Sequence, residues 1–195
     1  MTRHRTTLPP EHFAGYYAED PDPWRFATSP YEKARYAATL ASLPRPHYLS
    51  GLEIGCSIGI LTRHLAGRCD AVLGLDVVPS ALENARANCA GQPNARFALL
   101  AAPAEWPEGR FDLIVLSEVL YFFDRTDLAR LAGRVEGALL PGGNVVLVHW
   151  LGETNFPLTG DEAAEGFIAA TAGFARPVRQ DRAAEYRLDV LSREG

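Results

Sequence analysis

The chain has 195 residues, of which 47% are hydrophobic and 22% are charged, and its formal net charge is −5. This length and composition suit one globular domain with a sizeable core, and they exclude disordered, collagen-like and disulfide-framework proteins. A nucleic-acid partner normally requires a basic surface, so the acidic balance argues against one. The only basic cluster, residues 3–5, is interpreted as a solvated tail.

The cysteine pattern and the apolar runs point to the cytoplasm. Cys56, Cys69 and Cys89 contain no CxxC pair, and their odd number favours neither a disulfide framework nor a zinc site. No histidine spacing suggests a metal ligand set, so no metal is expected. The N-terminus lacks the apolar core of a signal peptide, and the longest apolar runs are too short to cross a bilayer. We therefore expect a cytoplasmic protein with reduced thiols and no membrane insertion.

The first 48 residues are predicted to form an arm rather than a domain. Residues 31–43 are expected to form one helix, and residues 16–24, which are rich in proline and aromatic side chains, precede it. Such a segment can order over a bound ligand and exclude water. The arm is therefore expected to be a lid, although a purely structural arm anchored by Trp24 is the alternative.

From residue 49 onward, apolar strands alternate with helical patterns. The expected strands are 52–54, 71–75, 97–100, 111–116 and 145–148, and the expected helices are 58–66, 80–90 and 128–139. This alternation predicts right-handed βαβ units and a parallel sheet that is covered on both faces.

The alternation of single strands and helices ends after Trp150. A helix over 161–172 is followed by two strands, 177–180 and 186–190, whose short polar connection leaves no room for a crossover helix. The chain is thus predicted to be an α/β protein with a Rossmann-like seven-stranded sheet, five parallel strands plus a C-terminal antiparallel hairpin. That plan resembles the class I methyltransferases, whose cofactor is S-adenosylmethionine, and we expect a single domain over 1–195 with the arm at 1–48 and the core at 49–195.

A glycine-containing turn joins the first strand to the first helix. Glu53 begins the run E-I-G-C-S-I-G, in which Gly55 and Gly59 permit a tight bend and a close approach of the ligand to the backbone. The helix that follows directs free amide groups toward the crevice, where the carboxylate of the cofactor's methionine moiety would be stabilised. Simple packing turns also carry this spacing.

Asp76 strengthens the prediction because it ends the second strand, 23 residues after Glu53. An acidic residue about 20 residues beyond the glycine turn typically holds a ribose diol. The alternative is that Asp76 caps the following helix, with Pro79 just inside its start. Val77 would offer an apolar face to the adenine.

Two positions depart from the usual methyltransferase pattern. Ser57 replaces the middle glycine of the turn, and Ala102 stands where an aspartate usually accepts from the adenine amino group. A backbone carbonyl or Glu105 would then have to replace that acceptor. Trp106 is expected either to pack over the adenine or to brace the loop.

Three motifs together resemble the nodulation methyltransferases of the NodS family. They are D-P-W-R-F at 22–26 with Thr28-Ser29 and Tyr31-Glu32, the turn at 53–59 with Leu61-Thr62, and L-S-E-V-L-Y at 116–121. The likeness covers about residues 16–150. It implies an S-adenosylmethionine-dependent N-methyltransferase, whose product is S-adenosylhomocysteine and whose acceptor is the free amine of an amino sugar or deacetylated chitooligosaccharide.

Catalytic side chains are expected where the fourth and fifth strands end. Glu118 is the leading candidate, because a carboxylate can orient an ammonium acceptor and take its proton. Tyr121 lies three residues on, and His149 is the second candidate base; each of the three has an ordinary structural role as its alternative. Residues expected to contact the cofactor are Trp24, Arg25, Glu53, Gly55, Cys56, Ser57, Gly59, Asp76, Val77, Ala102, Pro103 and Ser117. Arg25 is expected to pair either with the cofactor carboxylate or with an acidic surface residue.

The residues are also compatible with other functions. An O- or N-methyltransferase of another small metabolite would use the same fold, and an O-methyltransferase would more naturally employ His149 as its base. A catalytically inactive S-adenosylmethionine-binding protein is also compatible with the residues. A nicotinamide-dependent oxidoreductase requires G-x-G-x-x-G, which Gly55 and Gly59 do not fit. We expect a small-molecule or oligosaccharide acceptor and a monomer or weak homodimer.

Overall fold

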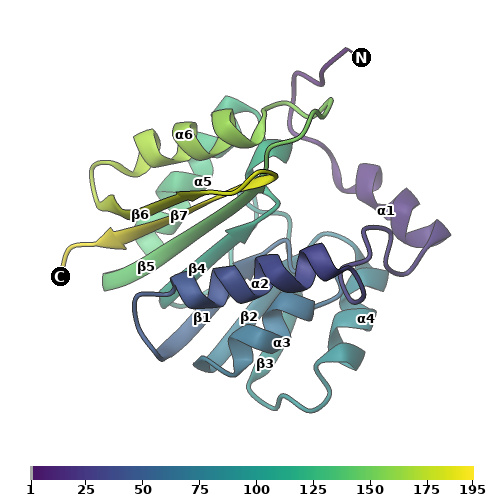
Figure 1. Cartoon of the computed structure of the whole chain (residues 1–195), viewed down its shortest axis with the longest axis horizontal. Coiled ribbons are helices and arrows are strands. Elements are labelled where there is room, and N and C mark those ends of the chain that lie inside the picture. The colour runs from purple at the N-terminus through teal and green to yellow at the C-terminus, as the bar shows by residue number, and fades with distance from the viewer. Residues whose placement is uncertain (1) are drawn as a thin grey trace.

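Seven strands form one mixed sheet in the computed structural model, which describes residues 2–195 (Figure 1). The strands are β1 (Tyr48–Ile54), β2 (Cys69–Asp76), β3 (Ala95–Leu99), β4 (Phe111–Ser117), β5 (Leu139–Trp150), β6 (Ala175–Arg182) and β7 (Tyr186–Arg193). Their order in the sheet is β3-β2-β1-β4-β5-β7-β6. The first five are parallel, and β7 runs antiparallel to both β5 and β6. The predicted class I methyltransferase sheet is confirmed.

Helices cover both faces of the sheet. They are α1 (Pro10–Glu19), α2 (Pro30–Ser42), α3 (Ile60–Ala66), α4 (Pro79–Asn88), α5 (Arg125–Ala138) and α6 (Gly160–Thr171), with a 3-10 turn, η1, at Leu120–Phe122. In Figure 1, α5 and α6 lie on one side of the sheet and α2 and α3 lie on the other.

Two apolar cores result, one on each face. Successive residues of β4 alternate between them: Ile114 and Leu116 pack with the α5–α6 core, while Leu113 and Val115 pack with the core under α2, α3 and α4. All seven residues of β4 are buried, as the continuous apolar run predicts for a central parallel strand. The sheet therefore gives the carboxyl ends of β1, β2 and β4 a rigid foundation.

Local sequence signals explain where several helices begin. Ser29 caps α2, whose first residue is Pro30, and Asp124 caps α5 by accepting from two backbone amides. Thr159 and Glu162 form a reciprocal capping box at α6.

The N-terminal region differs from the sequence prediction. Residues 3–5 are exposed, as predicted, but they also contact the rest of the chain: Arg3 pairs with Glu162 of α6 at 2.8 Å, and the amide of His4 donates to the carbonyl of Asn155 at 2.8 Å. The short helix α1 was not predicted, because ten residues with large apolar side chains at only Phe13, Tyr16 and Tyr17 give a weak helical period. Its Tyr17 is the one buried residue of that helix.

The junction of α5 and β5 also differs. The helix ends at Ala138, and β5 already begins at Leu139, which pairs with Phe111 of β4. The sequence Pro-Gly-Gly at 141–143 therefore lies within an irregular start of the strand rather than marking the end of the helix, and Gly142 has a φ of 71°.

Within residues 2–195, no helix is long and apolar enough to cross a membrane. The same part of the chain contains no group of three or more His, Cys, Asp or Glu side chains arranged to hold a metal ion.

Candidate active site

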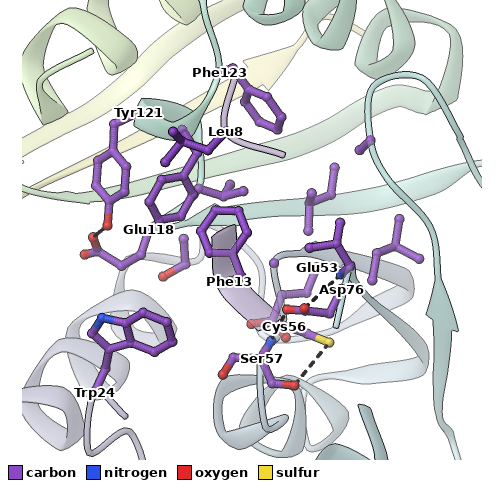
Figure 2. A pocket seen from close by; sticks show the side chains of 18 of the residues that line it. Leu8, Phe13, Trp24, Glu53, Cys56, Ser57, Asp76, Glu118, Tyr121 and Phe123 are labelled. Carbon is purple, nitrogen blue, oxygen red and sulfur yellow. Dashed lines mark hydrogen bonds between the residues drawn. The ribbon is translucent and has the colours of Figure 1, made fainter. Parts of the chain in front are cut away.

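A cavity of about 630 Å³ opens at the carboxyl ends of β1, β2 and β4. The turn after β1 and the end of β2 form one end, and the segment after β4 forms the other, while the N-terminal arm covers the space between them. Figure 2 shows the side chains, with Ser57 and Asp76 on one side and Glu118 and Tyr121 on the other. Ligands of open α/β sheets bind at this edge, so the location alone marks a candidate site.

The turn after β1 brings its backbone to the cavity. Gly55 and Gly59 have φ values of 76° and 75°, which side-chain-bearing residues rarely adopt. Ser57, which replaces the usual middle glycine, nevertheless takes a left-handed φ of 51°. Gly59 faces α4, where a Cβ atom would lie 2.9 Å from the Cβ of Ala85. Gly59 thus shapes the turn from behind and does not line the cavity.

Asp76 ends β2 and lines the same end of the cavity. Its carboxylate accepts from the backbone amides of Ser57 and Val77, both at 2.8 Å, and from that of Val78 at 3.0 Å. A carboxylate offers about four lone-pair positions, so one remains for a ligand hydroxyl. Burial raises the pKa of Asp76, and these backbone amides oppose that rise. The alternative role as helix cap is not what the structure shows, because Val78 occupies the N-cap position of α4.

Two further predicted residues lie beneath the turn. Glu53 is buried and accepts from the hydroxyl of Thr62 at 2.5 Å. Burial raises the pKa of Glu53 to about 8, with the Thr62 hydrogen bond opposing it. Burial likewise raises the pKa of Cys56, so this residue is a neutral thiol in the cavity wall.

A buried charge cluster forms the opposite end of the cavity. Arg35 of α2 is only 1% exposed, and its guanidinium pairs with Glu32, lies 3.0 Å from Oε1 of Glu118 and donates to Oγ of Ser117 at 3.0 Å. Burial opposes the charge of Arg35, but Glu118 and Glu32 together raise its pKa, so it remains a cation. Two carboxylates around one guanidinium leave one net negative charge when both acids are ionised.

Glu118 is held in one orientation. Its φ is 57°, an unusual value for a non-glycine residue that is typical of strained functional positions. Its Oε2 accepts from the hydroxyl of Tyr121 and from the backbone amide of Trp150 at 3.2 Å. Burial raises the pKa of Glu118, while Arg35, Tyr121 and Trp150 oppose the rise. Both Glu118 and Tyr121 line the cavity, and the Tyr121 ring stacks on Phe156 with centroids 5.2 Å apart.

His149 does not line the cavity. Its side chain is completely buried, and its Nε2 accepts from the backbone amide of Leu120 at 3.1 Å. Burial, together with the charges of Arg35 and Arg187, lowers the pKa of His149 to about 3. The structure therefore gives His149 the position of a neutral support for the turn after β4 rather than that of a base.

The loop after β3 presents mainly backbone and small side chains. Ala102 and Pro103 line the cavity. Glu105 folds back and accepts from the amide of Ala101 at 2.8 Å, and Trp106 packs against the core that contains α5. Neither Glu105 nor Trp106 is part of the cavity wall, so the structure favours a bracing role for Trp106.

The arm contributes more than the sequence suggested. Trp24 lines the cavity, whereas Arg25 pairs with Asp20 at 3.2 Å with its side chain 69% exposed and lies outside it. Tyr17 shares a hydrogen bond with Ser57, and Phe13 lies between the Asp76 and Glu118 sides (Figure 2).

The predicted site residues are therefore largely brought together. Those predicted to contact the cofactor that line the cavity are Trp24, Glu53, Gly55, Cys56, Ser57, Asp76, Val77, Ala102, Pro103 and Ser117. Arg25, Gly59 and His149 lie outside it. Arg35 and Phe13 were not predicted; the i, i+3 spacing of Glu32 and Arg35 on a helix was the one available signal.

Comparisons with known proteins show the family of the chain. The family model of nodulation protein S (NodS) matches residues 17–141. Nodulation protein S of Rhizobium tropici is 34% identical over 127 residues, which cover 64% of this chain and 53% of that protein. Trans-aconitate 2-methyltransferase of Methylobacterium radiotolerans is 38% identical over 147 residues, covering 73% of this chain and 55% of the other. The chain spans about half the length of these curated relatives.

A solved structure matches most of the chain. The N-methyltransferase NodS of Bradyrhizobium japonicum, in complex with S-adenosyl-L-homocysteine, superposes with a TM-score of 0.79 at 25% identity. The match covers 95% of this chain and 98% of that one.

Proposed function

Because the chain belongs to the nodulation protein S (NodS) family, we propose that it is an S-adenosylmethionine-dependent N-methyltransferase. The observation that carries this proposal is one cavity with two unlike ends. A backbone turn and Asp76 form one end, and a buried acid pair held by Arg35 forms the other. The first end suits a nucleoside, and the second suits a cationic acceptor.

The residues at the first end fit the cofactor. The turn at 55–57 has backbone exposed to the cavity, and the carboxylate of Asp76 keeps one acceptor position for a ribose hydroxyl. Glu53 lies beneath this turn, where its carboxyl group is available to the amino end of the methionine moiety. When bound, the cofactor supplies an electrophilic methyl group on its sulfonium.

The residues at the second end would prepare the acceptor. A nitrogen must be unprotonated to attack the methyl group, and Glu118 can orient the ammonium form and take its proton. Tyr121 and Trp150 hold the Glu118 carboxylate, and Arg35 holds its other oxygen, so its direction is fixed before the acceptor binds. Residues of the arm line both ends, which reduces the access of water to them.

An amino sugar is the acceptor class that we propose, as the free amine of a glucosamine or a deacetylated chitooligosaccharide. The acceptor end has aromatic walls, Trp24, Tyr31 and Phe156, on which a sugar ring can pack. A polycarboxylate such as trans-aconitate, the acceptor named for one relative, would meet the buried Glu32 and Glu118. That like-charge arrangement favours the amine. The reaction is expected in the cytoplasm.

Calorimetric titration of the pure protein with S-adenosylhomocysteine tests the cofactor site. We expect saturable binding, and the absence of heat at high micromolar ligand would reject the proposal. Labelled donor supplied with amino sugars, deacetylated chitooligosaccharides and simple amines then identifies the acceptor.

The Glu118→Gln variant tests the role of the acid. Removing a positioned proton acceptor should lower turnover by about 10²- to 10⁴-fold, with the affinity for S-adenosylhomocysteine unchanged. Unchanged turnover would make Glu118 a purely structural residue.

A further inference from the structure

The loop after β3 lines the part of the cavity where the proposed function places the adenine, but it lacks an acidic side chain directed into the cavity. Its first residue, Leu100, donates its amide to the backbone oxygen of Asp76 at 3.2 Å, so the loop lies directly beside the expected ribose site. A base attached to that ribose would therefore extend along residues 100–104, which line the cavity. The 6-amino group of adenine is a hydrogen-bond donor and needs an acceptor when it leaves water.

Several of the loop's own acceptors already take part in hydrogen bonds within the protein. The Ala101 carbonyl accepts from the amide of Glu105 at 2.9 Å. Arg134 of α5 donates from Nε to the Pro103 carbonyl at 3.1 Å and from its terminal nitrogen to the Ala104 carbonyl at 3.2 Å. The Glu105 carboxylate is turned to the Ala101 amide and lies outside the cavity wall.

These contacts of Arg134 also fix α5 against the loop. Asp127 lies seven residues before Arg134, about two helical turns at 3.6 residues per turn, and therefore on the same face of α5. Asp127 lines the cavity together with Ala102 and Pro103, and its side chain is 22% exposed.

The Asp127 carboxylate is also oriented in advance. The Thr7 hydroxyl donates to its Oδ2 at 2.6 Å, and Arg130 donates to its Oδ1 at 2.9 Å. A carboxylate has about four acceptor positions, so two remain for a ligand. Thr7 belongs to the N-terminal segment that crosses the cavity, so two distant parts of the chain position this one acid.

We propose that Asp127 is the acceptor for the 6-amino group of the cofactor's adenine, in place of the loop acid that Ala102 lacks. This inference rests on the proposed function, because it requires S-adenosylmethionine in the cavity. It assigns the recognition of the adenine to helix α5, and it makes Asp127 a binding residue rather than a catalytic one.

Binding of S-adenosylhomocysteine and S-inosylhomocysteine provides the test. The inosine base carries an oxygen acceptor where adenine carries its amino group, so it would face the Asp127 carboxylate with no proton between them. Hydrogen bonds to charged groups contribute about 1.5–3 kcal/mol, which corresponds to a preference of about 10- to 100-fold for the adenine compound. The dissociation constants are measured by calorimetry for the wild type and for each variant.

In Asp127→Asn, the side-chain amide can donate to the inosine oxygen while keeping the shape of the acid. We expect the preference to narrow by about tenfold or more. Asp124→Asn is the matched control, since Asp124 lies three residues earlier, also contacts Thr7 and does not line the cavity. Asp124→Asn should prefer S-adenosylhomocysteine over S-inosylhomocysteine by the same factor as the wild type. Glu105→Gln should also keep the preference of the wild type.

The outcomes separate the two proposals. An unchanged preference in Asp127→Asn, a narrowing in Glu105→Gln instead, or equal binding of both compounds by the wild type would overturn the role of Asp127. The last of these needs no variant and so does not depend on how a substitution folds. Failure of the wild type to bind S-adenosylhomocysteine at all would overturn the proposed function itself.

Discussion

Arg35 is the residue whose removal should disturb the acceptor end most. In Arg35→Met the cavity wall keeps a side chain of comparable length, but Glu32 and Glu118 lose the cation between them. Removing one partner of a buried ion pair typically costs about 3–5 kcal/mol, because it leaves an uncompensated buried charge. We expect a loss of this size in the free energy of unfolding near pH 8.

The loss should depend on pH in a defined direction. Burial already raises the pKa of Glu118 above its ordinary value, and Arg35 opposes that rise. Without Arg35, the pKa of Glu118 in the folded state rises further. The folded variant therefore binds more protons than the unfolded chain over a wider range of pH. Stability then falls as the pH rises through that range. The deficit should be smaller at pH 5, where the Glu118 carboxyl group is protonated more readily.

Urea unfolding at pH 5 and pH 8, followed by circular dichroism, measures this difference. Arg3→Met is the control, because Arg3 makes a surface pair with Glu162 that should contribute less than about 1 kcal/mol. Adding Glu118→Gln to Arg35→Met should recover about 1–3 kcal/mol, since the unpaired charge is gone. A deficit that is equal at both pH values and no larger than the control would refute the idea of a buried charge cluster.

Three other predictions follow from the same geometry. Gly59→Ala should lower the free energy of unfolding by about 1–3 kcal/mol, because Gly59 has a positive φ and close neighbours. The control is Gly137→Ala, in open space on α5, which should raise the free energy of unfolding by about 0.5–1 kcal/mol. Equal effects of the two substitutions in urea unfolding would contradict this prediction. Burial lowers the pKa of His149 to about 3, so folding stability should be lost as the pH falls from about 6.5 toward 3. His149→Gln should lose less stability than the wild type over this pH range and should keep most of its turnover. A large fall in turnover would indicate that His149 acts as a base. Asp76→Asn should weaken S-adenosylhomocysteine binding at least about tenfold by calorimetry, since it removes a charged acceptor, and unchanged affinity would remove Asp76 from the ribose site.

The parts of the fold and site that follow from short-range patterns were predictable. Strand and helix periods determine the sheet, and the short connection before Tyr186 required the antiparallel pairing that the structure shows. Asp76 and the turn at 55–59 were identifiable because both follow strands, and parallel strands bring their carboxyl ends to one edge. Glu118 follows from the same rule.

Residues that reach the site across long sequence separations could not be found in this way. Arg35 contacts Ser117, 82 residues away, and Thr7 contacts Asp127, 120 residues away. Helix periodicity shows that α2 has a buried face, but it does not show which part of the sheet that face meets. The sequence left His149 open between a base and a structural residue for a related reason: in β5, side chains alternate between the two faces, and proximity to a strand end does not reveal which face a side chain occupies.

The arm therefore has a chemical role that a lid alone would not have. Its helix α2 provides Arg35, the cation that allows Glu118 to face the cavity as a carboxylate, and its first residues provide Thr7, which orients Asp127. Glu118 follows strand β4 and Asp127 lies on helix α5, and the arm supplies a partner for each of these acids. Because each acid depends on a partner from the arm, docking of the arm and formation of both binding ends should be a single event rather than two.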